Sequence, residues 1–280
     1  MDRKTARSAH ASLFGTGNLV RPSRCSVIVA HPDDEVIGAG GLISKLGDVN
    51  IVHLTDGAPH DNRAALEAGF KRRGDYAQAR RRECVSALAI ANVPADRILE
   101  LGVANSHAPR FLADLTKRIK TFLQQSSPDI VLTQPYEGGH PDHDAAAFAT
   151  NAAVRLLARQ GFKPPTIFEM ALHPGDDGKK RVLDFLPSER RETTTLMLDE
   201  EAQELKRRMF DCFATQREVL KENPLGPERF RRPPAYDFTL PPQPGKLNYE
   251  NFDWGITRDE WQSLARKAWV DLFPDEVTVH

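Results

Sequence analysis

The sequence has few cysteines, no long apolar run and almost no net charge. Its three cysteines, Cys25, Cys84 and Cys212, lie far apart in the 280 residues and lack C-x-x-C spacing, which argues against a disulfide framework and a thiolate zinc site. No apolar run reaches the roughly 18–20 residues that a membrane-spanning helix needs. The 38 basic and 39 acidic side chains nearly balance, so no general attraction to nucleic acid is expected.

The cysteines and the first residues of the chain bear on its location. Reduced cysteines are typical of cytosolic proteins, so a cytoplasmic location is expected. The chain begins with Arg3, Lys4 and Arg7, but residues 8–17 are too polar for the core of a signal peptide. We interpret residues 1–22 as an N-terminal lead, with a weak export signal as the alternative.

The first 170 residues alternate short apolar runs with patterns of helical period. Strands are predicted at 25–30, 50–54, 97–101, 129–133 and 166–172, and helices at 36–46, 75–91, 109–125 and 142–160. Gly38, Gly40 and Gly41 in the first helix would permit close packing. Strands that alternate with helices indicate a Rossmann-like α/β fold, in which helices cover both faces of a mostly parallel sheet.

The pattern changes after about residue 172. Strands are predicted at 181–186 and 193–198, a helix at 200–221, an irregular Pro-rich segment at 223–245, and a last helix at 258–272. We divide the chain into a zinc-hydrolase core of α/β class at 23–198 and a C-terminal extension at 199–280 that packs on this core as a wrap. The aromatic side chains of the extension are explained by packing or by an oligomer contact, with stacking on a substrate ring as the alternative. They are Tyr236, Phe238, Tyr249, Phe252 and Trp254.

Two clusters of histidine and carboxylate follow predicted strands. The first strand runs directly into residues 31–35 (HPDDE), and the fourth is followed by residues 140–143 (HPDH). Ligands of parallel α/β sheets bind at the carboxyl ends of the strands, so the two clusters can converge on one point. Imidazole and carboxylate suit Zn²⁺, and a catalytic zinc has three protein ligands and one open position. The alternative is two hydrated turns in which Asp33 and Asp142 cap the following helices.

Together the two motifs resemble the LmbE/PIG-L family of zinc-dependent N-deacetylases. Residues 30–35 read AHPDDE and residues 139–143 read GHPDH, in the order found in that family. Its members include N-acetylglucosaminyl-phosphatidylinositol deacetylases and the deacetylases of mycothiol and bacillithiol synthesis. The resemblance extends over about residues 25–172. It implies a metal-dependent hydrolase that uses activated water to remove an N-acetyl group from a GlcNAc-like sugar or glycoconjugate.

The resemblance also implies a role for each side chain of the motifs. Three of them would be the zinc ligands: His31, Asp34 and His143. Asp33 would be the general base that takes a proton from the attacking water, and His140 would stabilise the oxyanion and protonate the leaving amine. Asp142 would hold His140 in orientation, and its carboxylate is expected to raise the pKa of His140.

Four further residues are candidates for substrate binding: Arg80, Asn105, Tyr136 and His173. Arg80 begins an R-x-x-E pair that the family often has, although the run of arginines at 80–82 leaves the choice of arginine open. Asn105 stands where the sugar deacetylases commonly have an aspartate. Tyr136 lies two residues before the position at which some relatives have a tyrosine, and His173 follows the fifth strand. The Thr-Asp-Gly at 55–57 resembles a turn that closes the family's pocket, with an ordinary Asp-Gly turn as the alternative.

Three functions remain open. The first is the deacetylase described above, with a small N-acylated molecule such as an amino sugar as its substrate and no nucleic-acid partner. The second is a zinc amidase of the same fold that cleaves a larger N-acyl group or a thiol-conjugate amide. The third is a non-enzymatic binding module, which would require both clusters to be accidental. The oligomeric state is left open, a homo-oligomer included.

Overall fold

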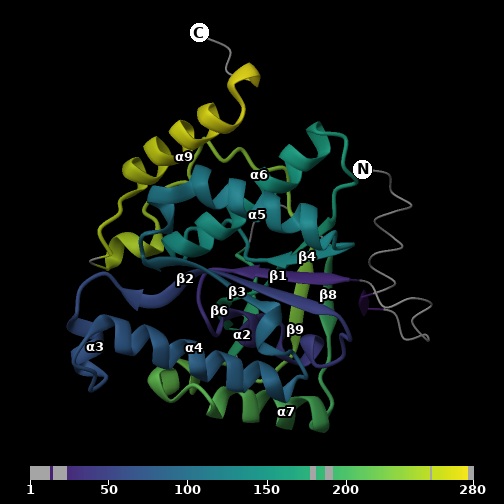
Figure 1. Cartoon of the computed structure of the whole chain (residues 1–280), viewed down its shortest axis with the longest axis vertical. Coiled ribbons are helices and arrows are strands. Elements are labelled where there is room, and N and C mark those ends of the chain that lie inside the picture. Colours follow the sequence, from purple (N-terminus) through teal and green to yellow (C-terminus); the bar gives the residue numbers. More distant parts are fainter. Residues whose placement is uncertain (1–12, 15–23, 177–180, 187–191, 253, 277–280) are drawn as a thin grey trace.

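A computed structural model describes residues 13–14, 24–176, 181–186, 192–252 and 254–276. Its centre is a seven-stranded sheet with the strand order β3-β2-β1-β4-β5-β9-β8 (Figure 1). The first five strands pair in parallel, as predicted. They are β1 (Cys25–Val29), β2 (Val49–Pro59), β3 (Ile98–Asn105), β4 (Ile130–Thr133) and β5 (Thr166–Met170).

Helices cover both faces of this sheet (Figure 1). One face carries α2 (Asp34–Ile43), α4 (Arg73–Ile90) and α7 (Glu200–Asp211), and the other carries α5 (Leu112–Ser126), α6 (Pro141–Arg159) and α9 (Arg258–Leu272). Alternate residues of β1 enter separate apolar clusters, Ile28 on one face and Val27 and Val29 on the other. The strand is buried at every position and, apart from Ser26, apolar, which is typical of a parallel strand buried on both faces.

The remaining elements are short. The helical ones are α3 (Arg63–Glu67), α8 (Arg217–Leu220) and the 3₁₀ turns η1 (Ala95–Arg97), η2 (Ala108–Phe111), η3 (Ala214–Gln216), η4 (Asn248–Asn251) and η5 (Pro274–Glu276). The strands are β6 (His173–Asp176), β7 (Arg181–Asp184), β8 (Thr193–Leu196) and β9 (Glu228–Arg231). β6 and β7 form a separate antiparallel hairpin.

The C-terminal part of the chain contributes a strand to the main sheet. β9 lies within the segment 223–245 that we expected to be irregular, and it pairs antiparallel with β5 and with β8. The expectation failed because this strand has only four residues. Three of them are charged and only Phe230 is apolar, so the sequence carries no apolar run.

The helix predicted at 200–221 is interrupted after Asp211. Beyond that point, Thr215 donates its backbone N–H and its hydroxyl to the carboxylate of Glu83 in α4, at 3.1 and 2.5 Å. Apolar periodicity predicted which residues face the core, but it could not predict this contact between distant segments.

The helix α2 contains a break that a buried carboxylate stabilises. Ala39 has φ −147° and ψ 19°, so the helical path is interrupted there. Just beyond it, the backbone N–H groups of Gly41 and Leu42 donate to Glu228 of β9 at 2.7 and 2.9 Å. A Cβ on Gly41 would lie 2.6 Å from the side chain of Leu198, which confirms that this glycine permits close packing.

A buried lysine completes this arrangement. Lys206 of α7 donates to the carbonyl of Ile37 and to Glu228, both at 2.8 Å. Both charged side chains are fully buried. The pair supplies partners to backbone groups on each side of the break, and it joins α7 and β9 to the helix that begins at Asp34.

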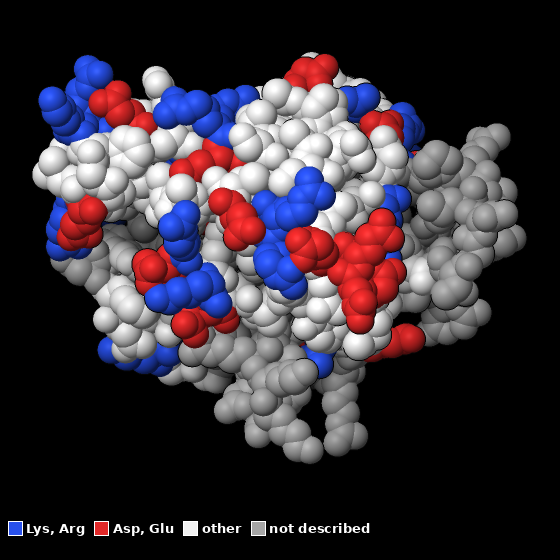
Figure 2. Space-filling model, turned by 90° about the horizontal axis from the view of Figure 1, so that it is seen from below, with Lys and Arg blue, Asp and Glu red and all other residues white. Residues whose placement is uncertain are grey.

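Two simpler expectations can be compared with the structure. The three cysteines are free thiols, as expected. In the described part of the chain, no helix combines the length and apolarity needed to cross a bilayer. On the face shown in Figure 2, basic and acidic side chains lie interspersed, in agreement with the small net charge.

We expect Lys206→Met to lower the free energy of unfolding by about 3–5 kcal/mol, because Glu228 would remain buried without its cation. The double variant Lys206→Met/Glu228→Gln should recover part of this loss. Urea denaturation followed by circular dichroism measures both. Lys221→Met is the matched control, because it removes only an exposed pair with Glu218 and should change little. Equal effects of Lys206→Met and Lys221→Met would contradict the prediction.

Candidate metal centre and adjoining pocket

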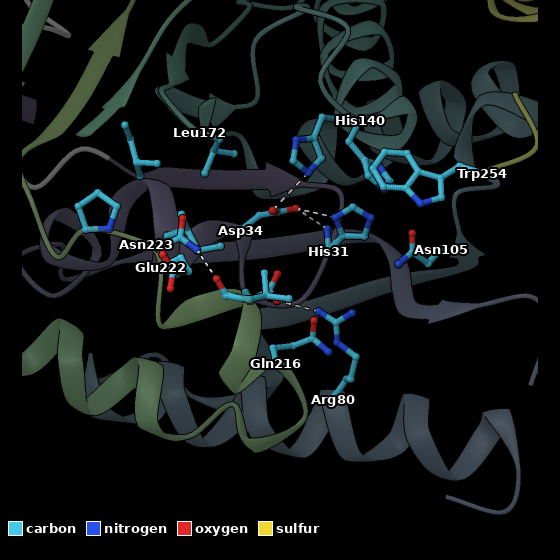
Figure 3. A pocket seen from close by; sticks show the side chains of 16 residues that line it. His31, Asp34, Arg80, Asn105, His140, Leu172, Gln216, Glu222, Asn223 and Trp254 are labelled. Carbon is cyan, nitrogen blue, oxygen red and sulfur yellow. Dashed lines mark hydrogen bonds and ion pairs between the residues drawn. The ribbon is translucent and has the colours of Figure 1, made fainter. Parts of the chain in front are cut away.

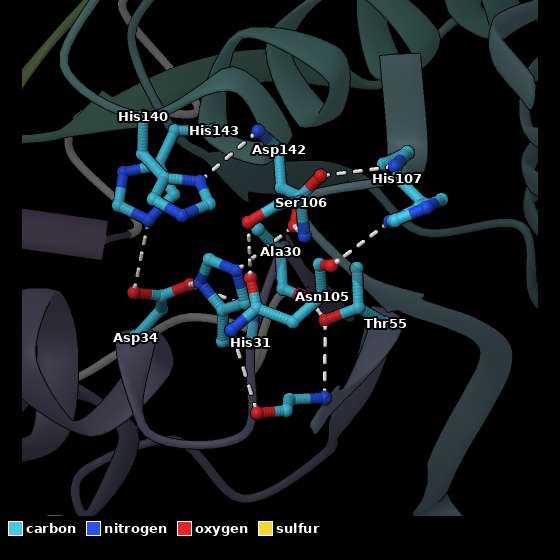
Figure 4. Close-up of polar contacts among 12 residues, drawn as sticks. Ala30, His31, Asp34, Thr55, Asn105, Ser106, His107, His140, Asp142 and His143 are labelled. Atoms are coloured by element: carbon cyan, nitrogen blue, oxygen red, sulfur yellow. Dashed lines mark hydrogen bonds and ion pairs between the residues drawn. The ribbon is translucent and has the colours of Figure 1, made fainter. Parts of the chain in front are cut away.

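The two histidine motifs meet where the connections of the sheet change direction. β1 and β4 are neighbours, but β1 leads through α2 to β2 on one side, whereas β4 leads through α6 to β5 on the other. Such a point leaves a crevice at the carboxyl ends of the two strands. The first turns of α2 and α6 bring both motifs to this crevice (Figure 4).

The predicted zinc ligands lie together in the structure. The carboxylate of Asp34 is between two imidazoles, with Oδ2 at 3.1 Å from His31 Nδ1 and Oδ1 at 3.4 Å from His143 Nε2. Ring nitrogens of His31, His140 and His143 also lie within 4.8 Å of one another. The geometry therefore brings the three predicted ligands together and adds His140 as a fourth nearby donor.

Asp142 has a different partner from the one we expected. Its carboxylate contacts His31 Nε2 at 3.1 Å and accepts backbone N–H groups from Ser106 and Ala108 at 2.6 and 2.9 Å. Its contact with His140 is through the backbone, because the Asp142 N–H donates to His140 Nδ1 at 3.1 Å. The side chain of Asp142 is buried against the segment after β3, so it orients His31 instead of His140.

These donors fit a zinc ion. When Nε2 of His31 donates its proton to a hydrogen bond with Asp142, Nδ1 carries a lone pair that faces the carboxylate of Asp34. A lone pair and a carboxylate repel each other, so a cation between these two groups would stabilise them. Burial opposes a charge on His31, but Asp34 and Asp142 outweigh it and raise its pKa to about 10. A histidine oriented by one carboxylate toward a second one is typical of zinc sites with imidazole and carboxylate ligands.

The electrostatic environment of His140 also differs from the expectation. Burial, together with repulsion from His31 and His143, holds its pKa well below the usual range, and the Asp142 carboxylate does not reach it. Because Nδ1 accepts the Asp142 N–H, the neutral ring has its proton on Nε2.

Asp33 lies beside the ligands and is held by Arg80. The guanidinium donates to Asp33 Oδ2 at 2.8 Å and to the carbonyl oxygens of Pro32 and Gly57 at 3.0 and 2.5 Å. Burial raises the pKa of Asp33 to about 7, against the opposing charge of Arg80. Of the three consecutive arginines, Arg80 is the buried one, and Arg81 pairs instead with Glu100. Arg80 therefore lines the pocket, and its guanidinium holds the carboxylate of Asp33, the predicted base, through a hydrogen bond.

The turn at 55–57 permits this contact. Gly57 has φ +70°, and a Cβ there would lie 2.5 Å from the guanidinium of Arg80. Glycine is thus required both by the backbone conformation and by the close approach of the arginine.

A buried pair behind Asp33 stabilises an unusual backbone conformation. Asp33 has φ 147°, a region that residues with a side chain rarely adopt. Its backbone N–H donates to Glu35 Oε2 at 3.2 Å, and the same oxygen contacts His53 Nε2 of β2 at 3.0 Å. Glu35 and His53 are fully buried, so the base is held by the backbone as well as through Arg80.

The metal centre opens into a pocket of about 460 Å³ (Figure 3). Asn105 lines it, as predicted, together with Arg80, Asp33 and the three histidines. Trp254 lines it too, with its ring 4.4 Å from that of His140. Of the five aromatic residues, Trp254 is therefore the one placed for stacking on a substrate, which stays a prediction, whereas Phe238 and Tyr249 are buried.

Two predicted substrate contacts need separate comment. Tyr136 is not among the residues that line the pocket. Its hydroxyl accepts from Trp261 Nε1 at 2.6 Å and donates to the Leu240 carbonyl at 2.7 Å, so α9 and the segment before it cover it. His173 is the first residue of β6 and pairs in register with Asp184, but its side chain lies outside the described part of the structure.

Gln134 is a site residue that our sequence analysis missed. It follows β4 and donates from Nε2 to Asp34 Oδ2 at 2.9 Å, while its Oε1 accepts the Ala30 N–H at 2.9 Å. The signal was present, because Gln134 is a polar residue directly after a buried strand at the same edge of the sheet.

Comparison with known proteins agrees with this geometry. Residues 26–154 match the family model described as "PIG-L: GlcNAc-PI de-N-acetylase". These residues form a domain of the PIG-L family. The resemblance inferred from the two motifs is confirmed, and the PIG-L domain extends from β1 into α6.

Two curated relatives and one solved structure illustrate the similarity. Diacetylchitobiose deacetylase of Thermococcus kodakarensis is 32% identical over 143 residues, which is 48% of this chain and 50% of that protein. The 1D-myo-inositol 2-acetamido-2-deoxy-alpha-D-glucopyranoside deacetylase of Salinispora arenicola is 29% identical over 175 residues, 53% of this chain and 56% of that protein. The chain thus spans about half the length of these relatives. A deacetylase of the teicoplanin biosynthesis pathway shares the fold, with a TM-score of 0.59 and 18% identity over 76% of this chain and 100% of that chain.

The PIG-L domain supplies only part of the pocket. It contains the metal centre, Asp33, Arg80 and Asn105. The opposite walls come from residues beyond 154, among them Leu172, Leu183, Val219 and Trp254. The part of the chain outside the matched region therefore forms only some of the pocket walls.

We expect the zinc-loaded protein to retain a single zinc ion, and His143→Ala to lose it. His140→Ala should keep the metal, because Asp34 contacts His31 and His143 and not His140. Elemental analysis after zinc loading and desalting measures both, with His107→Ala as a control at a histidine outside the cluster. Full retention in His143→Ala, or loss in His140→Ala, would mean that the ligand set is different.

Proposed function

We propose that this protein is a zinc-dependent N-deacetylase, which hydrolyses the amide of an N-acetylated, GlcNAc-like sugar or glycoconjugate. The observation that supports this most is the convergence of three groups on one pocket: the metal centre, the buried carboxylate of Asp33 and the imidazole of His140. The PIG-L domain and the deacetylase names of the relatives support the same reaction. We also propose that the protein is cytoplasmic and that its substrate is a small molecule.

A division of work follows from the contacts. A bound zinc ion supplies Lewis acidity that polarises the amide carbonyl. Asp33 accepts a proton from the attacking water, since its raised pKa of about 7 makes it a better base than an ordinary aspartate. Arg80 keeps this carboxylate in place and opposes its protonation. His140 presents the N–H of Nε2 to the developing oxyanion, and Asp33 passes the proton that it took from the water to the leaving amine.

Asp33→Asn should lower kcat by about 10²–10⁴-fold, because the variant lacks the general base. It should keep its zinc, whereas Asp34→Asn should lose zinc first. Amine release from N-acetylglucosamine and its glycosides, with metal content measured on the same samples, separates the two effects. An inactive but zinc-loaded Asp34→Asn beside a zinc-free Asp33→Asn would reverse our assignment of the adjacent carboxylates.

Arg80→Gln should move the acidic limb of the kcat/KM profile to higher pH, by roughly 1–3 units. The reason is that the Arg80 charge lowers the pKa of Asp33, so its removal raises that pKa and the base is protonated up to a higher pH. Arg81→Gln is the matched control, because Arg81 pairs with Glu100 and should leave the profile unchanged. An unmoved acidic limb in Arg80→Gln would assign that limb to another group.

A further inference from the structure

We propose that the C-terminal part of the chain positions His140 for amide hydrolysis, through Trp254 and Asn248. Trp254 packs on the imidazole ring, and Asn248 holds the backbone that leads into His140. Both residues lie outside the PIG-L domain. The inference rests on the proposed role of His140 as the donor to the oxyanion, and it names the residues on which that role depends.

The ring of His140 receives little support from its own motif. Its Nδ1 accepts the backbone N–H of Asp142 at 3.1 Å, but the carboxylate of Asp142 contacts His31 instead. One hydrogen bond fixes the position of Nδ1 and leaves the tilt of the ring to other contacts. The tilt matters, because the N–H of Nε2 must point to the place where negative charge develops.

Trp254 packs against this ring. The two ring centroids are 4.4 Å apart, with an angle of 44° between the rings. This is shorter than the 4.6 and 5.1 Å that separate the ring of His140 from those of His31 and His143, two of the predicted zinc ligands. Figure 3 shows Trp254 beside His140 at one end of the pocket. Trp254 therefore restricts the tilt of His140 from outside the metal centre.

Asn248 holds the two glycines that precede His140. Its backbone N–H donates to the carbonyl of Gly138, and its side-chain Nδ2 donates to the carbonyl of Gly139, both at 3.0 Å. Gly138 has φ +72°, and a Cβ there would lie 2.8 Å from the side chain of Leu247. Glycine thus permits the close approach of the C-terminal segment, and the two hydrogen bonds fix the turn before His140.

The segment that carries Asn248 and Trp254 is itself anchored. The carboxylate of Glu250 accepts the backbone N–H groups of Leu247 and Arg258, at 2.6 and 3.1 Å. Leu247 is fully buried. The carbonyl of Gly255 accepts a hydrogen bond from Nη2 of Arg110 at 2.7 Å. Because both ends of the segment are held, its position is passed on to His140.

Contact with the substrate is the competing explanation for Trp254, because this residue also lines the pocket. Asn248 separates the two explanations. It is exposed and is not among the residues that line the pocket of the metal centre. An effect of Asn248 on turnover is therefore expected to act through His140.

The first experiment measures kcat and KM for N-acetylglucosamine with zinc-loaded variants. Trp254→Leu should lower kcat by about 10²-fold, because a catalytic group misplaced by about 1 Å can cost this much. Trp254→Phe keeps an aromatic ring beside His140 and should recover most of the loss. Trp269→Leu is the matched control, since Trp269 packs on Phe273 and does not line the pocket.

The second variant removes the hydrogen bond to Gly139. Asn248→Ala should lower kcat by about 10-fold and leave KM unchanged, because the substrate pocket is intact while His140 is less well held. Asn251→Ala is the matched control, since Asn251 is exposed in the same 3₁₀ turn and does not line the pocket. Metal content is measured on the same samples and should be equal in all variants.

The third measurement needs neither metal nor turnover. Long-range ¹H–¹⁵N NMR spectra of the metal-free protein report the histidine rings, and His140→Gln assigns the signals of His140. We expect these signals to move in Asn248→Ala, although Asn248 donates to the backbone before His140 and not to its ring. They should stay in place in Asn251→Ala.

The outcomes separate this inference from the proposed function. A higher KM with unchanged kcat in Trp254→Leu would make Trp254 a substrate contact only, and unmoved His140 signals in Asn248→Ala would show that the ring is held without this segment. Either result overturns the inference and leaves the deacetylase proposal standing. If the wild-type protein hydrolyses no amide, the proposed function fails, and the NMR spectra alone decide whether the C-terminal part holds His140.

Discussion

The protein buries carboxylates deep in its core, and each of them needs donors that replace water. The same solution recurs at three places. Asp142 accepts the N–H groups of Ser106 and Ala108. Asp144 accepts those of residues 137 and 138, and Glu228 accepts those of residues 41 and 42. In each case the carboxylate joins its own element to another segment of backbone. Buried carboxylates therefore hold together the segments that surround the candidate metal centre.

Contacts between distant segments also stabilise the strained backbone of Asp33. A backbone with φ 147° is costly for an aspartate and persists only where neighbours over-determine it. Glu35 fixes the backbone N–H, Arg80 fixes the carboxylate, and Gly57 makes room for Arg80. These residues come from α2, α4 and the end of β2. The conformation of the predicted base thus depends on three elements that meet only in the folded protein.

This dependence explains what could be predicted from the sequence. β1, β2, β4 and β5 were predictable because a strand buried on two faces is largely apolar, and the motifs were recognisable because they follow β1 and β4. The partners of the motif residues were not. Asp142 contacts His31 across 111 residues of sequence, and Tyr136 contacts Trp261 across 125. A short pattern carries no information about such pairs. β9 was missed because its four residues carry no apolar run, and the partners of its Glu228 lie far away in the sequence, in α2 and α7.

The candidate metal centre and part of the pocket wall come from different parts of this chain. The PIG-L domain at residues 26–154 contains the candidate metal centre and Asp33, whereas Leu172, Val219 and Trp254 of the pocket wall come from beyond it. A contact of α2 joins these two parts, because Ile37 lines the pocket and its carbonyl accepts a hydrogen bond from Lys206 of the C-terminal part. A change in the C-terminal part can therefore reshape the pocket without altering the metal ligands. For this reason the names of relatives that match about half of their own length inform the reaction, whereas the substrate must be derived from the walls of this pocket.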